Sequence, residues 1–331
     1  MAREAGVSVT AVSHAMNGKG TISDTTRATV REVAERLGYQ ADPLARGLRN
    51  SPLGLIGLML RPLDSLGTYR PDGVDYFTRL AGAVAVECLD REMSVMLVRD
   101  LTRLPRSPLT LSLDGYIIDD PVERDPVIDL LTGLDIPFVS VGRDVGRPEM
   151  TSWVDSPLRE ETETVLEGFH GSGARSVALV TGTDRNSWNL DSIAAYEGWC
   201  RRRGVRPRIA RRPESAGSDG GRAAVRELLA DGLGVPDALY CLTGRHASGA
   251  LAELRSLGVD VPTQTQLIAG SDSEQCRSSQ PPISAIDLEP ALVAAAAVHQ
   301  LMVRLGRVED SEAPELHSRL VPRGTTLPWR S

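Results

Sequence analysis

Two periodicities of apolar residues divide the chain near residue 53. Before this point, apolar residues recur at helical spacing, and Val12 and Met16 are four positions apart. A second stripe at helical spacing consists of Val30, Val33, Ala34 and Leu37. After residue 53, continuous apolar runs alternate with amphipathic stretches, which predicts buried strands followed by helices. The pattern therefore predicts an all-α head followed by an α/β body.

The segment 6–20, GVSVTAVSHAMNGKG, predicts a tight turn followed by a short helix. Gly6 permits the turn, and Ser8 is a favourable N-cap for the helix that follows. Asn17 and Gly18 end this helix. The spacing therefore predicts a turn followed by a short helix that ends at Asn17 and Gly18.

Ser23 predicts the start of another helix, over 24–37, with Gly38 just beyond its end. Two short helices joined by such a turn form a helix-turn-helix, whose second helix enters the major groove of DNA. The same residues also fit an ordinary three-helix domain with no role in DNA binding. The predicted domains are a helix-turn-helix head over 1–41, a hinge helix and linker over 42–52, and a body over 53–331.

The stretch 42–50, DPLARGLRN, predicts the hinge helix. Asp42 is a cap and Pro43 occupies the first helical position, with about two turns to follow. A helix this short is unstable alone in water, so it would form only against a partner such as DNA. A plain linker is the alternative, because Gly47 and the segment 50–52 interrupt regular structure.

The body reads as two successive series of strands and helices. The predicted strands are 53–60, 94–98, 114–119, 136–142, 176–182, 237–242 and 265–272. The predicted helices are 74–91, 125–132, 191–203, 222–229 and 248–257. Such alternation indicates parallel sheets with right-handed crossovers. Two series indicate two lobes, and ligands bind such folds in the crevice at the carboxyl ends of the strands.

Composition and charge narrow the class of protein. The chain has 331 residues, of which 41% are apolar and 24% charged, as expected for about two globular domains. The four cysteines form no C-x-x-C pair, and we expect them to be reduced in a cytoplasmic protein. No apolar run indicates a signal peptide or a membrane span. Residues 1–50 carry seven basic and five acidic side chains, whereas the whole chain has a net charge of −7, and a basic head favours a polyanionic partner.

The head resembles that of the LacI-type (lactose-repressor) family of bacterial transcription regulators. The match runs without a gap from Ala2 to Leu48 and includes the turn, the recognition helix, the third helix ending in LGY and the PLARGL hinge. By position, the resemblance implies base contacts from Val9, Thr10 and His14, phosphate contacts from Ser8, Ser13, Asn17, Ser23 and Thr26, and minor-groove contacts from Ala45 and Leu48. Leu48 would be the wedge that opens a central base step. Family members have more residues before Ala2, which favours a true start upstream of Met1.

The body also resembles this family, whose body is periplasmic-binding-protein-like with two lobes. The matching motifs include DGYII, IPFVSVGR, WVDSP and the closing RLVPRGTT. The family's three crossings between lobes imply a first lobe of about 54–153 plus 288–320 and a second of about 158–286. The resemblance implies a homodimer, a pseudo-palindromic double-stranded DNA operator and a small-molecule effector, with sugars among the candidates. A repressor is the favoured interpretation. The sequence leaves open whether the ligand releases the protein from DNA or promotes DNA binding.

The candidate effector site departs from the family pattern. Asp272 and Asp155 follow strands at the cleft, and Trp188, Tyr196 and Thr243 are the other candidate effector-binding residues. The family's usual arginine is replaced by Ala195, the usual Asn-Asp pair by Thr243 and Gly244, and a second aspartate by Ser273. Trp199 is expected to be buried, whereas Tyr69 and Phe77 are open candidates at the edge of the cleft. These changes favour an unusual effector, or none.

An enzyme has little support in the sequence. The chain contains no G-x-x-x-x-G-K-[ST], no H-E-x-x-H and no G-x-S-x-G, and its five histidines have no i, i+4 pairing. We therefore expect no catalytic residues, no metal site and no cofactor. Two hypotheses follow: an effector-responsive DNA-binding regulator, or a cytoplasmic ligand-binding module whose truncated head does not read DNA.

Overall fold

A computed structural model describes residues 2–8, 11–12, 14–15, 22–36, 52–61, 75–105, 107–309 and 314–329. The chain divides into two compact units, Met1–Leu53 and Gly54–Ser331, which are described separately below. Of the predicted hinge over 42–52, only residue 52 is described, so the hinge helix lies outside the described residues.

The described part of the first unit has the expected caps. Gly6 has a φ of +66°, the left-handed conformation that a turn after a helix requires. Ser8 Oγ accepts a hydrogen bond from the backbone N–H of Ala11 at 3.0 Å, so Ser8 caps the following helix as predicted. Helix α2 spans Asp24–Arg36, and Ser23 Oγ accepts from the N–H of Thr26 at 3.2 Å. Both predicted N-caps are therefore confirmed.

Apolar side chains of the two helical segments form the core of the head. Val30 and Val33 of α2 are buried, which confirms two members of the predicted stripe. On the preceding helical segment Ala15 is 1% exposed, whereas Val12 is half-buried.

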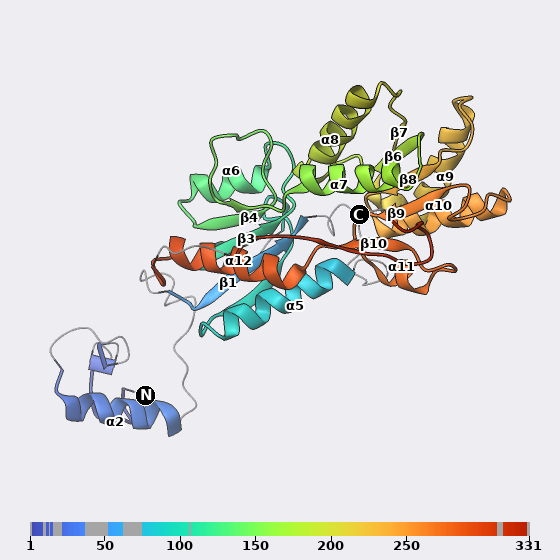
Figure 1. Ribbon diagram of the computed structural model, residues 1–331. Helices are drawn as coiled ribbons and strands as arrows, with labels where there is room; N and C mark the ends of the chain where they lie inside the picture. The colour runs from blue at the N-terminus through green and yellow to red at the C-terminus, as the bar shows by residue number, and fades with distance from the viewer. Residues whose placement is uncertain are drawn as a thin grey trace. The chain divides into compact units, whose positions relative to one another are not determined.

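The body begins with a first lobe built on a fully parallel sheet of order β2-β1-β3-β4-β5. The strands are β1 (Leu55–Leu60), β2 (Ser94–Val98), β3 (Gly115–Asp119), β4 (Phe138–Val141) and β5 (Trp153–Val154). The helices are α5 (Asp75–Leu89), α6 (Pro126–Gly133) and α12 (Pro290–Arg304), with a 3-10 turn η1 (Pro108–Leu111). Figure 1 shows α5 and α12 side by side over one face of this sheet.

The second lobe is a sheet of order β11-β10-β9-β8-β6-β7. Its strands are β6 (Val177–Thr181), β7 (Ile209–Arg211), β8 (Ala238–Cys241), β9 (Gln266–Ala269), β10 (Ser284–Asp287) and β11 (Arg319–Val321). Its helices are α7 (Leu158–Gly171), α8 (Ser187–Arg203), α9 (Gly217–Ala230), α10 (Gly244–Ser256) and α11 (Glu274–Ser278), with a 3-10 turn η2 (Glu214–Ala216). Strand β11 runs antiparallel to β10, so this sheet is mixed rather than wholly parallel as predicted.

The chain crosses between the lobes three times, as the resemblance implied: after β5, after β10 and before β11. The predicted end of the first lobe at 320 is wrong by a short segment. Residues 319–321 pair with β10 and therefore belong to the second lobe. Strand β10 pairs with β9 on one side only, and residues 319–321 form hydrogen bonds with its other edge.

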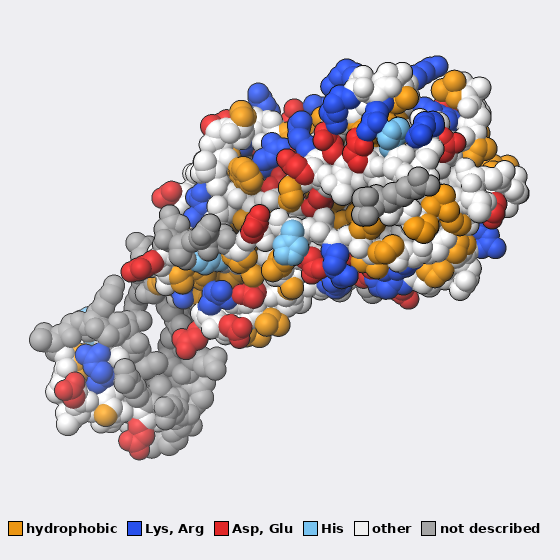
Figure 2. Space-filling view, viewed as in Figure 1, with side chains coloured by type: hydrophobic (Ala, Val, Ile, Leu, Met, Phe, Trp, Pro, Cys, Tyr) orange, Lys and Arg blue, Asp and Glu red, His pale blue; other side chains and the backbone are white. Residues whose placement is uncertain are grey.

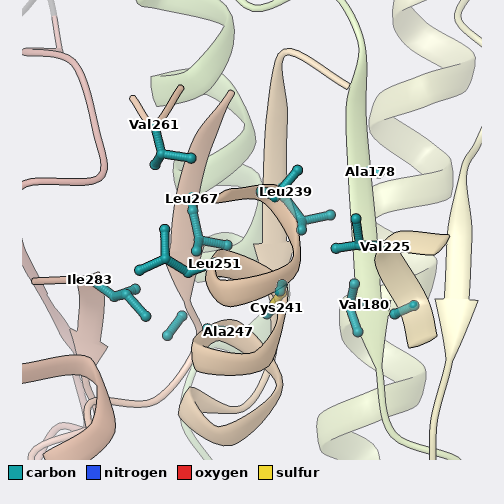
Figure 3. Packing of buried hydrophobic residues seen from close by; sticks show 14 of the residues in the cluster. Ala178, Val180, Val225, Leu239, Cys241, Ala247, Leu251, Val261, Leu267 and Ile283 are labelled. Carbon is teal, nitrogen blue, oxygen red and sulfur yellow. The ribbon is translucent and has the colours of Figure 1, made fainter. Parts of the chain in front are cut away.

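The core of the second lobe shows why its sheet and helices pack closely. Figure 3 shows Val180, Leu239 and Leu267 on neighbouring strands, with Leu267 beside Leu251 of α10 and Val180 beside Val225 of α9. Helices α9 and α10 come into direct contact at Gly249, where an added Cβ would lie 1.8 Å from the carbonyl oxygen of Ser218. Any side chain there would force the two helices apart. The four cysteines are buried and unpaired, as expected.

Candidate functional site between the lobes

A cavity of about 130 Å³ opens between the two lobes of the body. The first lobe contributes the ends of β3 and β5 and the start of α5. The second lobe contributes the starts of α8 and α10, the turn η2 and the segment after β9. The cavity therefore lies at the carboxyl ends of parallel strands from both sheets, where open α/β folds bind ligands.

The structure places four of the five predicted effector residues in this cavity: Asp155, Trp188, Thr243 and Asp272. Trp188 follows the first residue of α8 and is half-buried. Thr243 caps α10, and its Oγ1 accepts from the N–H of His246 at 3.2 Å. Phe77, an open candidate, also lines the cavity, whereas Tyr69 lies outside the described residues.

Tyr196 does not line the cavity, and its prediction as an effector contact is corrected. Its ring is fully buried in the core of the second lobe. The hydroxyl donates to the carbonyl oxygen of Val177 at 2.7 Å and accepts from the N–H of Arg208 at 2.9 Å. Tyr196 thus ties α8 to β6 and to the residue before β7, and Trp199, one turn later, is buried as expected.

Asp272 lies in the cavity wall with both carboxylate oxygens in ion pairs. Arg323 donates to Oδ1 at 2.9 Å and to Oδ2 at 2.8 Å, and Arg277 donates to Oδ2 at 3.2 Å. Burial opposes the charge, but the two guanidinium groups outweigh it and lower the pKa of Asp272. Asp272 therefore stays ionised and holds the two arginines in place.

Asp155 is paired less fully. Its Oδ2 accepts from Nε of Arg143 at 3.3 Å, and the same arginine also forms an ion pair with Asp191 of the second lobe. Burial raises the pKa of Asp155 to about 7, despite the opposing charge of Arg143. The carboxyl group therefore titrates near neutral pH.

Sequence reasoning missed four further acidic residues in the cavity: Asp75, Asp119, Asp120 and Glu214. Burial raises the pKa of Asp119 to about 8 and that of Glu214 to about 7, and burial with neighbouring carboxylates raises the pKa of Asp120. The signal was present, since two consecutive aspartates directly follow the buried run of β3. Burial raises the pKa of the Tyr76 hydroxyl in α5, and the charges of Asp119, Asp120 and Asp155 raise it further.

Polar contacts join the lobes around the cavity. Nδ2 of Asn186 donates to Asp120 at 2.6 Å, and Nη2 of Arg277 in α11 forms a 2.7 Å ion pair with Asp75 in α5. Further contacts connect Glu123 with Arg185 at 2.6 Å. Because these pairs span the two lobes, a movement of one lobe against the other must break or rebuild them.

Four predicted DNA contacts belong to the described residues: Ser8, His14, Ser23 and Thr26. Ser8 and Ser23 are exposed, and His14 and Thr26 are half-buried. The others lie outside the described residues: Val9, Thr10, Ser13, Asn17, Ala45 and Leu48.

Within the described ranges, no three His, Cys, Asp or Glu side chains are arranged to hold a metal ion. The helices that the structure describes include none long and apolar enough to cross a bilayer.

A two-lobed body with a cavity at the ends of its parallel strands, joined to a helix-turn-helix head, defines a DNA-binding regulator of the ligand-responsive class. Residues 1–42 match the profile of the bacterial regulatory proteins of the lacI family, and residues 166–326 match that of the periplasmic binding protein-like domain. The chain belongs to the LacI family of bacterial transcription regulators.

Similar proteins match this chain over nearly its full length. Catabolite control protein A of Staphylococcus aureus is 22% identical, with 98% of each chain covered. Two solved structures have the same fold: a Lac repressor dimer bound to operator and the anti-inducer ONPF, and a transcriptional regulator CelR–cellobiose complex. The first has a TM-score of 0.75 at 20% identity, covering 99% of this chain and 98% of that one. The second has a TM-score of 0.69 at 22% identity, covering 98% of each.

Proposed function

We propose that this regulator binds operator DNA as a homodimer through its head and that a small molecule in the cavity between the lobes changes its operator affinity. The observation that carries the proposal is the position of the cavity, whose walls come from both lobes and whose rim is crossed by ion pairs. A ligand that binds one lobe arrangement better than another shifts the population between them. The relatives are regulators, and we assign no reaction to the cavity.

The head supplies the sequence-reading surface in this proposal. Ser8 and Ser23 are exposed at helix N-termini, where hydroxyl and backbone N–H groups are well placed for phosphates. On the face of the body shown in Figure 2, acidic and basic side chains are interspersed over the first lobe, and basic side chains gather along the upper edge of the second lobe.

Selection of duplexes from random DNA by the full chain tests this function. We expect enrichment of one pseudo-palindromic sequence, since a two-fold dimer reads two half-sites. His14→Ala should cost about 1–3 kcal/mol at one position of each half-site and relax the preference there. Failure to enrich any sequence would support the ligand-binding module without a DNA-reading head instead. An unchanged consensus for the variant would remove His14 from the base contacts.

Leu48→Ala tests the proposed hinge. A leucine wedge that orders only on DNA predicts a melting temperature within a degree or two of the parent, a change of under about 0.5 kcal/mol. Operator affinity should fall steeply, because the kink and the minor-groove contacts form together. A buried leucine predicts the reverse, a loss of about 2–5 kcal/mol of stability with intact operator binding.

Exposed apolar side chains on the first lobe support the homodimer. Val86 and Leu89 of α5 and Leu97 of β2 are 58%, 67% and 64% exposed, and β2 is an edge strand of its sheet. An apolar patch beside an open strand edge is typical of a protein interface. Leu97→Glu should convert the dimer to a monomer in sedimentation experiments, whereas Leu233→Glu, on an exposed turn of the second lobe, should leave it intact.

A further inference from the structure

The charge of the cavity wall is strongly unbalanced. Six carboxylates line it, from Asp75, Asp119, Asp120, Asp155, Glu214 and Asp272, against one arginine, Arg245. A closed cavity strengthens the interaction of these charges with each other and with any ligand, because little water screens them. A ligand in this cavity must therefore suit a wall that has more acidic than basic side chains.

Ion pairs from behind the wall neutralise only half of these carboxylates. Asp75 and Asp272 share Arg277, and Asp272 also binds Arg323. Asp155 binds Arg143. Among the described residues, Asp119, Asp120 and Glu214 have no ion-pair partner. Arg245 lies near enough to Glu214 to attract it, and the N-terminal ends of α8 and α10 offset part of the remaining charge.

Asp119 supplies an independent sign of a missing partner. Its side chain is 2% exposed and lines the cavity, yet Oδ2 has no hydrogen-bond partner in the part of the chain that the structure describes. A buried carboxylate oxygen without a donor costs free energy unless a ligand supplies one. Asp120, the next residue, has a φ of +54°, a strained conformation that is typical of binding sites.

Aromatic side chains complete the wall beside these acids. Tyr76 and Phe77 pack edge to face with centroids 5.3 Å apart, and Trp188 lies in the opposite lobe. Carboxylates beside aromatic rings form an environment that binds ammonium groups, through charge and through the ring faces. A cavity of about 130 Å³ has room for about one six-membered ring or an equivalent chain, judged against an apolar cavity that holds benzene.

Other ligand chemistries fit less well. A phosphate or carboxylate would bring a further anion beside acids whose pKa values are already raised by burial and by neighbouring carboxylates. A metal ion requires convergent ligands, which the described acids do not provide. A neutral sugar could hydrogen-bond these carboxyl groups, but it would supply no positive charge to a wall with six acids and one arginine.

We propose that the effector is a small hydroxylated amine, such as an amino sugar or amino polyol, whose ammonium group lies between Asp119, Asp120 and Glu214. The ammonium supplies three N–H donors, and the unpartnered Oδ2 of Asp119 accepts one of them. The hydroxyl groups and carbon skeleton lie against Tyr76, Phe77 and Trp188. This inference rests on the proposed function of the cavity as the effector site.

Matched pairs of compounds test the charge directly. Glucamine and sorbitol differ by one ammonium in place of one hydroxyl, as do glucosamine and glucose. Thermal shift and titration calorimetry of the full chain at neutral pH should show binding by at least one amine. Its neutral partner should bind at least about tenfold more weakly, which corresponds to about 1.4 kcal/mol.

Variants locate the ammonium. Asp119→Asn keeps the size of the side chain and removes its charge, and it should weaken the amine at least about tenfold while affecting the neutral partner far less. Asp90→Asn is the matched control, because Asp90 is exposed in the turn after α5, away from the cavity residues. It should bind the amine as the parent does.

Three results would overturn the inference: equal or tighter binding of the neutral partners, no binding by any amine of the set, or unchanged amine affinity in Asp119→Asn. Tight binding of sorbitol or glucose, without binding of either amine, would contradict an amine as the effector. It would remain consistent with the cavity as the effector site. Operator selection by the parent chain without any ligand is a separate readout. Its failure would contradict the DNA-binding function and would not depend on the ligand class.

Discussion

The first lobe contains two groups of buried carboxylates that differ in their partners. Asp100 and Asp125 are both paired with Arg61, which donates to them at 2.7 and 2.9 Å. Asp119 and Asp120, at the end of β3 in the same lobe, have no cationic partner among the described residues. Thr102 and Arg61 outweigh the burial that would raise the pKa of Asp100 and so lower it, whereas burial raises that of Asp119 to about 8. The paired acids, Asp100 and Asp125, stabilise the lobe, whereas the unpaired acids, Asp119 and Asp120, are available to bind a ligand in the cavity.

Breaking the paired group should have the largest effect. Arg61→Met removes the partner of two buried carboxylates and should destabilise the protein by about 3–5 kcal/mol, because uncompensated buried charge is costly. Chemical denaturation of the full chain measures this change. Arg103→Met is the control, since Arg103 is 58% exposed and lies 3.7 Å from Asp100. Its loss should cost under about 1 kcal/mol. Similar losses for both variants would show that Arg61 does not organise the group.

The unpaired group should make stability depend on pH in a defined direction. The folded pKa of Asp119 in this group is about 8, and the pKa values of two other acids of the same cavity, Asp155 and Glu214, are about 7; all three lie above those of unfolded carboxyls, which are about 4. Between these limits the folded state binds more protons than the unfolded state, so its stability falls as the pH rises from about 4 to about 8. Melting temperatures across this range measure the effect. A rise in stability from pH 6 to 8 would contradict the assignment.

Neutralising one member of the unpaired group should have a smaller effect of opposite sign to Arg61→Met. Asp119→Asn should raise the melting temperature of the ligand-free protein at pH 8, because it removes a buried charge that lacks a partner. It should also flatten the pH dependence. Asp90→Asn, at an exposed turn, should change neither. A lower melting temperature at pH 8 for Asp119→Asn would indicate a partner for its carboxylate.

Local chemistry made the caps and most strands of the protein predictable. Ser8 and Ser23 cap their helices because the hydroxyl lies next to the N–H groups it accepts from. Helix α12 was not predicted from its pattern. Its run of alanines and valines is buried on several sides, so its apolar residues show no amphipathic contrast.

The site was predictable in position but not in chemistry. Asp155 and Asp272 follow strands, and this alone places them at the cleft. The partner of Asp272, Arg323, lies 51 residues later, and no local pattern connects the two. Tyr196 was predicted wrongly, because an aromatic residue on an α8 turn can face the core as readily as the cleft. The adjacent residues Asp119 and Asp120 could have been recognised from the sequence, because they are polar residues at the end of a buried strand.

The most direct test of the whole account is operator affinity with and without an amine. The operator is the duplex selected by the parent chain, and the amine is the compound of the matched pairs that gives the largest thermal shift. Fluorescence anisotropy should show a change in operator Kd of about 5- to 150-fold on adding this amine to the parent chain, and little change in Asp119→Asn. Equal responses of the parent and the variant, or no response of the parent, would contradict the claim that the unpaired acids of the cleft control the head.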